Sequence, residues 1–410
     1  IMLNGVNEVV SGFETWSGSP SADVSGLTVA GIVELDVADF ISLWVFADAT
    51  SAYSVKEGSG FSAGLLNARE SELAGVYAYQ ASPSEWREVQ AWTDRVEGGP
   101  ITSRWFDAAV GRFSADVAGV HMVSTTVLLS GASHGHFSAN IALNGQPDSG
   151  NGLYMRTASE QWRTELLTVS ICGLVAMERE DFVSVWTYAT DRSYSVGAQS
   201  SFAGALLADA AIGFGADKHG QQVVAQSGWT EVKGWTTTGT GGRAGLFNLA
   251  SGSHQFDPVT GRFEADASTT YFASVNLVLE ECNTGHFAVR VALSGETGQN
   301  SGLYATKPAT PSGVISISLS GLVTLESGDY FSIWVHSSDD PLFRASDHSG
   351  FACAKVDWTD FAVGARVDTP IAVASQRWAE IPGWSTDVRP FFEIGQDFDA
   401  TSGRYTLSQL

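Results

Sequence analysis

The sequence predicts an all-β chain built from tandem β-sandwich modules, and three observations carry this prediction. A motif that reads Phe-Asp, three residues, then Gly-Arg-aromatic occurs three times along the 410 residues. The copy at 256–263 leads into alternating apolar and polar residues, which is typical of a strand with one buried face. Glycine, at 44 residues, and aromatic residues, at 11%, favour short strands joined by tight turns.

The repeated motif is interpreted as a turn between two strands. Its copies contain Phe106, Asp107 and Gly111, then Phe256, Asp257 and Gly261, then Phe398, Asp399 and Gly403. An aspartate can bond to the backbone of the turn that it begins, and a glycine can adopt the positive φ that a chain reversal needs. A binding role for the aspartate or the arginine is the alternative. Because both recur in every copy regardless of local context, the structural interpretation is favoured.

Two tryptophans, six residues apart, precede each copy of the motif. The pairs are Trp86 and Trp92, Trp229 and Trp235, and Trp378 and Trp384. Such a pair could form a platform on which a sugar ring stacks. Recurrence at the same point of every repeat favours packing in a core or between modules instead.

The spacing of these landmarks sets the predicted domain organisation. The first tryptophans of successive pairs lie 143 and 149 residues apart, from Trp86 to Trp229 and from Trp229 to Trp378. Ile1 matches Ile141, in the middle of a repeat, and Leu410 aligns with Ser268. We therefore expect the second half of a module in 1–80, complete modules in 81–222 and 223–370, and in 371–410 the first half of a further module, or the piece that completes the first.

The charge and the motif content exclude several function classes. The net charge is −23, from 45 acidic and 22 basic residues, and such a surface repels nucleic acid and anionic membranes. No apolar run approaches the roughly 18 residues of a membrane span. Motifs for nucleophilic serine, zinc-protease or phosphate-binding sites are lacking, so the sequence predicts no enzyme and no catalytic residues.

Calcium is the one cofactor that the sequence leaves open. Its candidate ligands are two acidic pairs, Asp36 with Asp39 and Asp339 with Asp340, because carboxylate oxygens are the ligands that calcium prefers. No Asp-x-Asp-x-Asp-Gly loop is present, so a role in loop structure is the alternative.

The three cysteines of the chain share no repeat position and no zinc-site spacing. They are Cys172, Cys282 and Cys353. We expect buried small side chains, with at most one internal disulfide.

Four motifs in a fixed order suggest a family resemblance. They are Thr-Gly-Arg-Phe at 260–263, Gly-Val-His-Met at 119–122, Leu-Glu-Ser-Gly-Asp at 325–329 and Phe-Ala-Gly-Ala-Leu-Leu at 202–207. The repeat thereby resembles the globular head of complement C1q and, more distantly, the tumour necrosis factor family. The chain departs from that pattern where His121 and Met122 replace expected aromatic residues, and where Ala38 and Glu180 replace a glycine. The resemblance implies jelly-roll sandwiches, about three per chain, that associate as trimers. Three such modules on one chain then imply a single-chain pseudo-trimer.

Two functions follow from these observations. The first is a non-enzymatic extracellular structural protein, secreted or on a cell-surface appendage. It would associate with identical or similar modules as the repeat unit of a filament, sheath or adhesive matrix. The alternative is a soluble recognition protein of the C1q type that binds carbohydrate, protein or other surface ligands. The first is favoured because repetition is visible in the sequence and a binding constellation is not.

Overall fold

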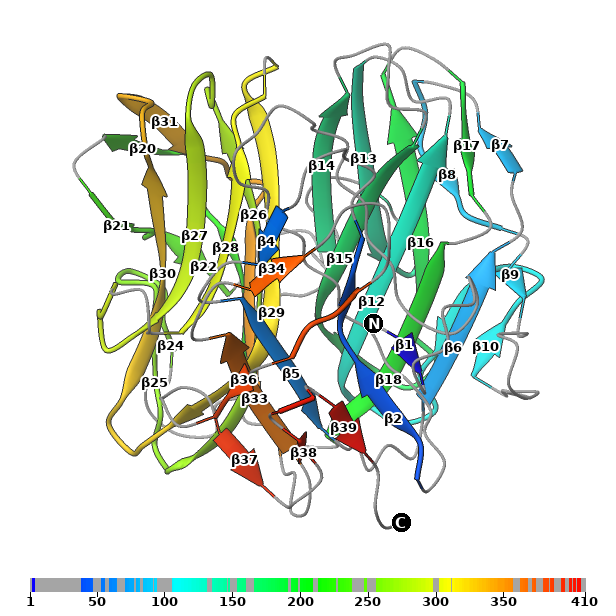
Figure 1. Cartoon of the computed structure of the whole chain (residues 1–410). Coiled ribbons are helices and arrows are strands. Elements are labelled where there is room, and N and C mark those ends of the chain that lie inside the picture. The colour runs from blue at the N-terminus through cyan, green and yellow to red at the C-terminus, as the bar shows by residue number, and fades with distance from the viewer. Residues whose placement is uncertain are drawn as a thin grey trace.

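A computed structural model gives the architecture of the chain. The structure describes residues 2–3, 38–46, 53–55, 59–64, 71–76, 79–81, 84–90, 92–93, 105–130, 135–145, 147, 153–159, 166–190, 193–197, 200–208, 213–225, 228–237, 247–248, 256–297, 302–310, 312–356, 362–367, 371–373, 379–382, 384–386, 392–394, 398–399, 401–402 and 404–406. Every regular element in these ranges is a β-strand, and the strands pair antiparallel (Figure 1). The predicted all-β class is confirmed.

The first sandwich consists of two sheets with a shared core. Its inner sheet has the order β7 (Tyr79–Ala81), β17 (Tyr194–Val196), β12 (Gly119–Ser130), β18 (Ser201–Ala208), β6 (Ser71–Val76) and β9 (Trp92–Thr93), with β15 (Leu166–Met177) paired to β12. Its outer sheet has the order β10 (Phe106–Asp107), β11 (Arg112–Ser114), β16 (Phe182–Ala189), β13 (Gly135–Leu143) and β14 (Leu153–Ser159), with β8 (Arg87–Glu88) paired to β16. The chain changes sheets between β12 and β13 and again between β14 and β15, as in a jelly roll.

The second sandwich repeats this strand plan. Its inner sheet has the order β20 (Gln222–Ala225), β31 (Leu342–Ala345), β26 (Thr269–Glu280), β32 (Gly350–Lys355), β19 (Gly213–Lys218) and β22 (Trp235–Thr236), with β29 (Val314–Leu325) paired to β26 and β23 (Phe247–Asn248) to β19. Its outer sheet has the order β24 (Phe256–Asp257), β25 (Arg262–Glu264), β30 (Tyr330–Ser337), β27 (His286–Leu293) and β28 (Leu303–Pro308), with β21 (Thr230–Glu231) paired to β30.

A third set of strands joins the two ends of the chain. It contains β1 (Met2–Leu3), β2 (Phe40–Ser42), β3 (Trp44–Val45), β4 (Tyr53–Val55) and β5 (Gly60–Gly64) from the N-terminal part, and β33 (Ala362–Val367), β34 (Ile371–Val373), β35 (Ala379–Glu380), β36 (Trp384–Ser385), β37 (Phe392–Ile394), β38 (Phe398–Asp399) and β39 (Arg404–Thr406) from the C-terminal part. Four pairs cross between the parts: β2 with β39, β3 with β35, β4 with β34 and β5 with β33. In Figure 1 the blue β4 and β5 lie beside the orange β34 and β33 in the middle of the molecule, and the blue β2 lies beside the red β39 lower down.

The strand pairing places module boundaries earlier than those expected at residues 80, 222 and 370. Strand β6 precedes residue 80 but pairs with β18 of the first sandwich, and β19 precedes residue 222 but pairs with β32 of the second. Likewise β33 precedes residue 370 and pairs with β5. The physical reason is that the first strand of each sandwich pairs with its last, which the tryptophan landmarks do not reveal. We propose 71–208 and 213–356 as the two complete modules.

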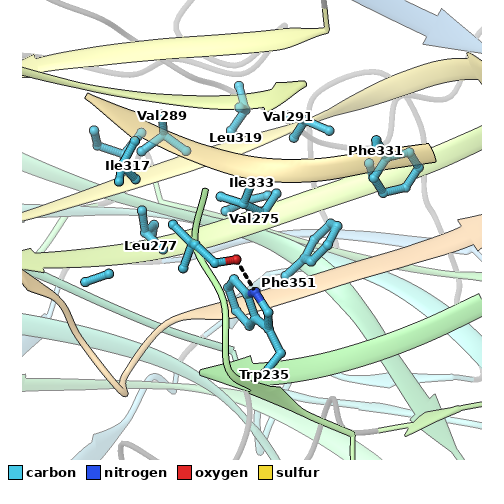
Figure 2. Close-up of a cluster of buried hydrophobic side chains, with 14 of the residues drawn as sticks. Trp235, Val275, Leu277, Val289, Val291, Ile317, Leu319, Phe331, Ile333 and Phe351 are labelled. Atoms are coloured by element: carbon cyan, nitrogen blue, oxygen red, sulfur yellow. Dashed lines mark hydrogen bonds between the residues drawn. The ribbon is translucent and has the colours of Figure 1, made fainter. Parts of the chain in front are cut away.

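Alternate side chains of each strand fill the core of the second sandwich (Figure 2). On β26 the odd-numbered residues from Tyr271 to Leu279 belong to this core, and Phe331 and Ile333 of β30 meet them from the opposite sheet. Trp235 is buried in the same cluster, and its indole N–H donates to the Val232 carbonyl oxygen at 2.9 Å. Burial of side chains this large stabilises the fold by about 1.5–3 kcal/mol each.

Two cysteines, Cys282 and Cys353, are part of this core, whereas Cys172 belongs to a separate apolar cluster between the two sandwiches. All three are buried free thiols, as expected of small core side chains. Burial raises the pKa of the Cys172 thiol to about 12, and it also raises the pKa values of Cys282 and Cys353. Because the thiolate is the reactive form of cysteine, burial lowers the reactivity of these side chains.

Candidate functional site

The repeated turn motif forms a short hairpin in each set of strands. In the first two hairpins the motif glycine donates its N–H to the carbonyl oxygen of the motif aspartate, at 2.7 Å for Gly111 and 2.8 Å for Gly261. Both glycines have a positive φ, of 71° and 74°. The aspartate Oδ1 accepts the N–H two residues further on in all three copies, at Asp107, Asp257 and Asp399. The hydroxyl groups of Thr260 and Ser402 donate hydrogen bonds to the carboxylates of Asp257 and Asp399, respectively. These bonds lower the pKa values of both aspartates. Gly403, the third motif glycine, lies outside the described residues.

The second tryptophan of each pair explains why the motif needs glycine. A Cβ on Gly261 would lie 2.7 Å from the Trp235 ring and 2.8 Å from the Val232 carbonyl oxygen, and Gly111 is in the same position against Trp92. All three second tryptophans are buried, and their indole N–H groups donate to a backbone carbonyl three residues earlier: Trp92 to Val89, Trp235 to Val232 and Trp384 to Ile381. The motif phenylalanines Phe106, Phe256 and Phe398 are buried as well.

The motif arginine is held between a glutamate and an aromatic ring in every copy. The glutamate contacts are Arg112 to Glu88 at 3.2 Å, Arg262 to Glu231 at 2.9 Å and Arg404 to Glu380 at 2.9 Å. The guanidinium carbons lie 4.3 Å from the centre of the Phe182 ring, 4.6 Å from that of Tyr330 and 4.5 Å from that of Phe40. The hydrogen bond from Arg404 lowers the pKa of Glu380, and the bond to Glu231 raises the pKa of Arg262. Each arginine therefore fastens its hairpin to neighbouring strands.

The first tryptophans of the first two pairs lie on the outward surface of the outer sheets. Trp86 is half-buried against Tyr154 and Tyr188, with ring centres 6.3 Å and 5.5 Å away. Trp229 is half-buried against Tyr304 and His336, at 6.3 Å and 5.3 Å. Trp378 lies outside the described residues. The two pairs whose members are both described are therefore divided between a core residue and a surface residue.

The two sandwiches meet at an interface that we call the seam, where β14 and β15 of the first contact β26, β29 and β32 of the second. Its apolar cluster contains Val120, Met122, Cys172, Leu174, Phe272, Leu322, Ala352, Ala354 and Val356. Hydrogen bonds cross it as well: the Asn276 side-chain amide donates to the Cys172 carbonyl oxygen at 3.0 Å, and the Arg156 N–H donates to Ser316 Oγ at 3.1 Å. The seam also includes an edge-on contact between the rings of Tyr154 and His348, at 5.6 Å.

The acidic calcium candidates do not converge in the part of the chain that is described. Asp340 is buried, and its Oδ2 accepts the N–H groups of Asn283 and Thr284, whereas Asp339 is exposed. Asp39 directly precedes β2, and Asp36 lies outside the described residues. No group of three or more His, Cys, Asp and Glu that could hold a metal occurs within the described ranges. Those ranges also contain no helix able to cross a membrane.

Sequence reasoning missed the partners of the motif arginine. Glu88, Glu231 and Glu380 each follow the first tryptophan of a pair by two residues, so a Trp-x-Glu pattern was available in all three repeats. The seam residues Asn276 and Ser316 carry no comparable signal. Their partners are 104 and 160 residues away in sequence, and only the packing of the sandwiches joins them.

The solved structures that match this chain each cover about a third of it. No family model and no curated protein matches the chain. Among solved structures, it is similar to Eiger TNF from S. frugiperda, with 18% identity over 35% of this chain and 96% of the other, and a TM-score of 0.27. It is also similar to the globular domain of zebrafish complement 1qA, with 18% identity over 32% and 98% of the two chains and a TM-score of 0.22. Murine APRIL at pH 5.0 matches with 14% identity over 34% and 100%, and a TM-score of 0.25.

Proposed function

We propose that the chain is a non-enzymatic structural protein, whose modules close on one another as a single-chain pseudo-trimer and serve as the repeat unit of an extracellular filament, sheath or adhesive matrix. The seam is the observation that carries this proposal. It joins two different surfaces, the β14–β15 edge of one sandwich and the inner sheet of the next. Such a heterologous contact either closes into a ring or propagates.

A second contact in the same direction supports closure within the chain. Strand β29, which corresponds to β15, contacts β5 and β33 of the third strand set. Gly321 of β29 approaches Ser62 of β5 so closely that a Cβ on this glycine would lie 3.2 Å from the serine Oγ. Linking the modules on one chain makes their association independent of protein concentration.

Solution scattering, light scattering and negative-stain electron microscopy test the two parts of the proposal separately. A compact particle with the mass of one chain at low concentration supports the pseudo-trimer, and an extended three-bead profile contradicts it. Fibres or sheets of stacked particles at higher concentration support the assembly role. Isolated particles at every concentration, from a full-length preparation, contradict that role.

A recognition function is the second candidate, and the exposed ring of Tyr304, beside the half-buried Trp229 and His336, favours it. Tyr304 is 40% exposed, although large apolar side chains of the described residues are mostly buried. A solvent-accessible ring that packs against further aromatic rings offers a surface on which a ligand can stack.

A further inference from the structure

The second sandwich presents a cluster of aromatic side chains on the outward surface of its outer sheet. We call this cluster, formed by Trp229, Arg290, Tyr304 and His336, the aromatic face. Arg290 lies on β27, between β30 and β28, and directly opposite Tyr304 of β28 in the ladder. Trp229, just before β21, contacts both Tyr304 and His336 of β30. The face therefore draws on four separate segments of one rigid sheet.

Arg290 fixes the geometry of the aromatic face. Its guanidinium carbon lies 5.1 Å from the centre of the Trp229 ring and 5.0 Å from that of Tyr304, and the side chain is only 3% exposed. A guanidinium in contact with two aromatic rings attracts both of them and limits their rotation. The rings are thus held in place before any ligand arrives, which reduces the ordering cost of binding.

The first sandwich has the same surface in a closed form. Asn140 occupies the position of Arg290, opposite Tyr154. Tyr154 is only 8% exposed, because its ring contacts His348 across the seam, and its hydroxyl lies 3.0 Å from Ser138 Oγ. The corresponding tyrosine of the second sandwich, Tyr304, keeps 40% of its surface open. The two sandwiches therefore differ in access to a common aromatic arrangement.

We propose that the aromatic face binds an uncharged pyranose sugar. The apolar C–H face of a pyranose ring packs on exposed aromatic rings such as that of Tyr304, which present large flat surfaces at low entropic cost. The phenol of Tyr304 and the imidazole of His336 supply polar groups for the sugar hydroxyls. The chain carries a net charge of −23, which disfavours the approach of acidic sugars. The inference rests on the recognition function proposed above and not on the assembly role, since no residue of the aromatic face belongs to the apolar cluster in the seam.

A glycan array that contains neutral and acidic oligosaccharides gives the first test, and the best neutral binder is then titrated by saturation-transfer NMR. Tyr304→Ser removes the exposed ring, and Trp229→Ala removes the ring that contacts it. We expect each change to weaken binding by about tenfold or more. Arg290→Asn copies the residue of the first sandwich and should weaken binding as well. The matched control is Trp86→Ala, which removes the equivalent tryptophan from the closed surface and should leave the affinity unchanged.

Three results would overturn the proposal. They are no neutral-sugar binding at about 10 mM, binding of acidic sugars alone, or an equal loss of binding in Trp86→Ala and Trp229→Ala. Melting curves of each variant check the fold. Because Tyr304 is partly exposed on an outward surface, the Tyr304→Ser variant should fold. It therefore keeps the test decisive even if the Trp229→Ala variant does not fold. Failure here leaves the particle shape and the fibre formation measured above unaffected.

Discussion

The first and second sandwiches share a framework and differ in the residues that fill or face it. In both, a buried tryptophan packs on the motif glycine, and the motif arginine lies between a glutamate and an aromatic ring. Along the matching strands β12 and β26, however, His121 stands where the second sandwich has Tyr271, and Met122 where it has Phe272. The contacts within each hairpin are thus the same in both sandwiches. Residues at matching positions of the wider core and the seam differ between them.

The largest expected effect concerns the seam. Phe272→Ala should reduce the free energy of unfolding by about 3–5 kcal/mol, because a large buried ring is replaced by a cavity. Its counterpart Met122→Ala should cost about 2–3 kcal/mol. Urea titration followed by tryptophan fluorescence measures both. Equal losses below about 1 kcal/mol would show that the seam is not packed as described.

Acid should distinguish the two sandwiches next. His121 is fully buried against Phe113, and burial lowers its pKa to about 4. The unfolded state therefore binds the proton more tightly, so stability is complete above about pH 6.5 and falls as the pH drops towards 4, by about 3 kcal/mol.

The variant His121→Tyr, which copies Tyr271, should lose less stability on acidification than the natural protein. Melting curves of both proteins at pH 7.5 and pH 4.5 separate the contribution of the histidine to the acid-induced loss of stability from that of the carboxylates, which both proteins share. An identical acid-induced drop in melting temperature would contradict the assignment to His121.

The motif glycine gives a smaller and local effect. Gly261→Ala should destabilise by about 2 kcal/mol, since the new Cβ meets the Trp235 ring at a positive φ. Gly220→Ala is the matched control, because Gly220 has a φ of 65° but no atom within 4 Å of the new Cβ. The control should cost about 1 kcal/mol. Thermal unfolding compares the two, and equal costs would remove the tryptophan contact as the reason for glycine.

The ion pairs of the motif arginines should differ less between the two sandwiches in their contribution to the free energy of unfolding. Glu231 is 6% exposed and takes two hydrogen bonds from Arg262, whereas Glu88 takes one from Arg112 at 3.2 Å. Glu231→Gln should therefore cost about 1 kcal/mol and Glu88→Gln about half of that, after allowance for the exposed arginines. Chemical denaturation in low and high salt measures both. A larger effect at Glu88 would reverse the ranking.

Calcium should have the smallest effect. The Oδ2 atom of Asp340 already accepts two backbone N–H groups, and Asp339 lies exposed beside it. Melting temperatures in calcium and in chelator should agree within about 1 °C. A rise of several degrees in calcium would establish a cation site and direct attention to the acidic pairs.

Much of the framework could be predicted from the sequence. The turn conformation and the need for glycine in the motif depend on local backbone chemistry, so a few consecutive residues are enough to predict both. The Trp-x-Glu pattern that positions Glu231 was also visible, although its partner Arg262 lies 31 residues further on. The different environments of Trp229 and Trp235 could not be predicted, because a six-residue spacing does not show which sheet surface each ring reaches.

The amino-acid order alone determined that this chain forms strands, reverses at three equivalent hairpins and repeats one plan, because these properties depend on neighbours within a few residues. The tertiary structure alone decided that β6 pairs with β18, that Asn276 bonds across the seam to Cys172, and that Tyr304 is open where Tyr154 is closed. Each of these depends on segments brought together by the burial of apolar surface, and such burial is a property of the whole fold.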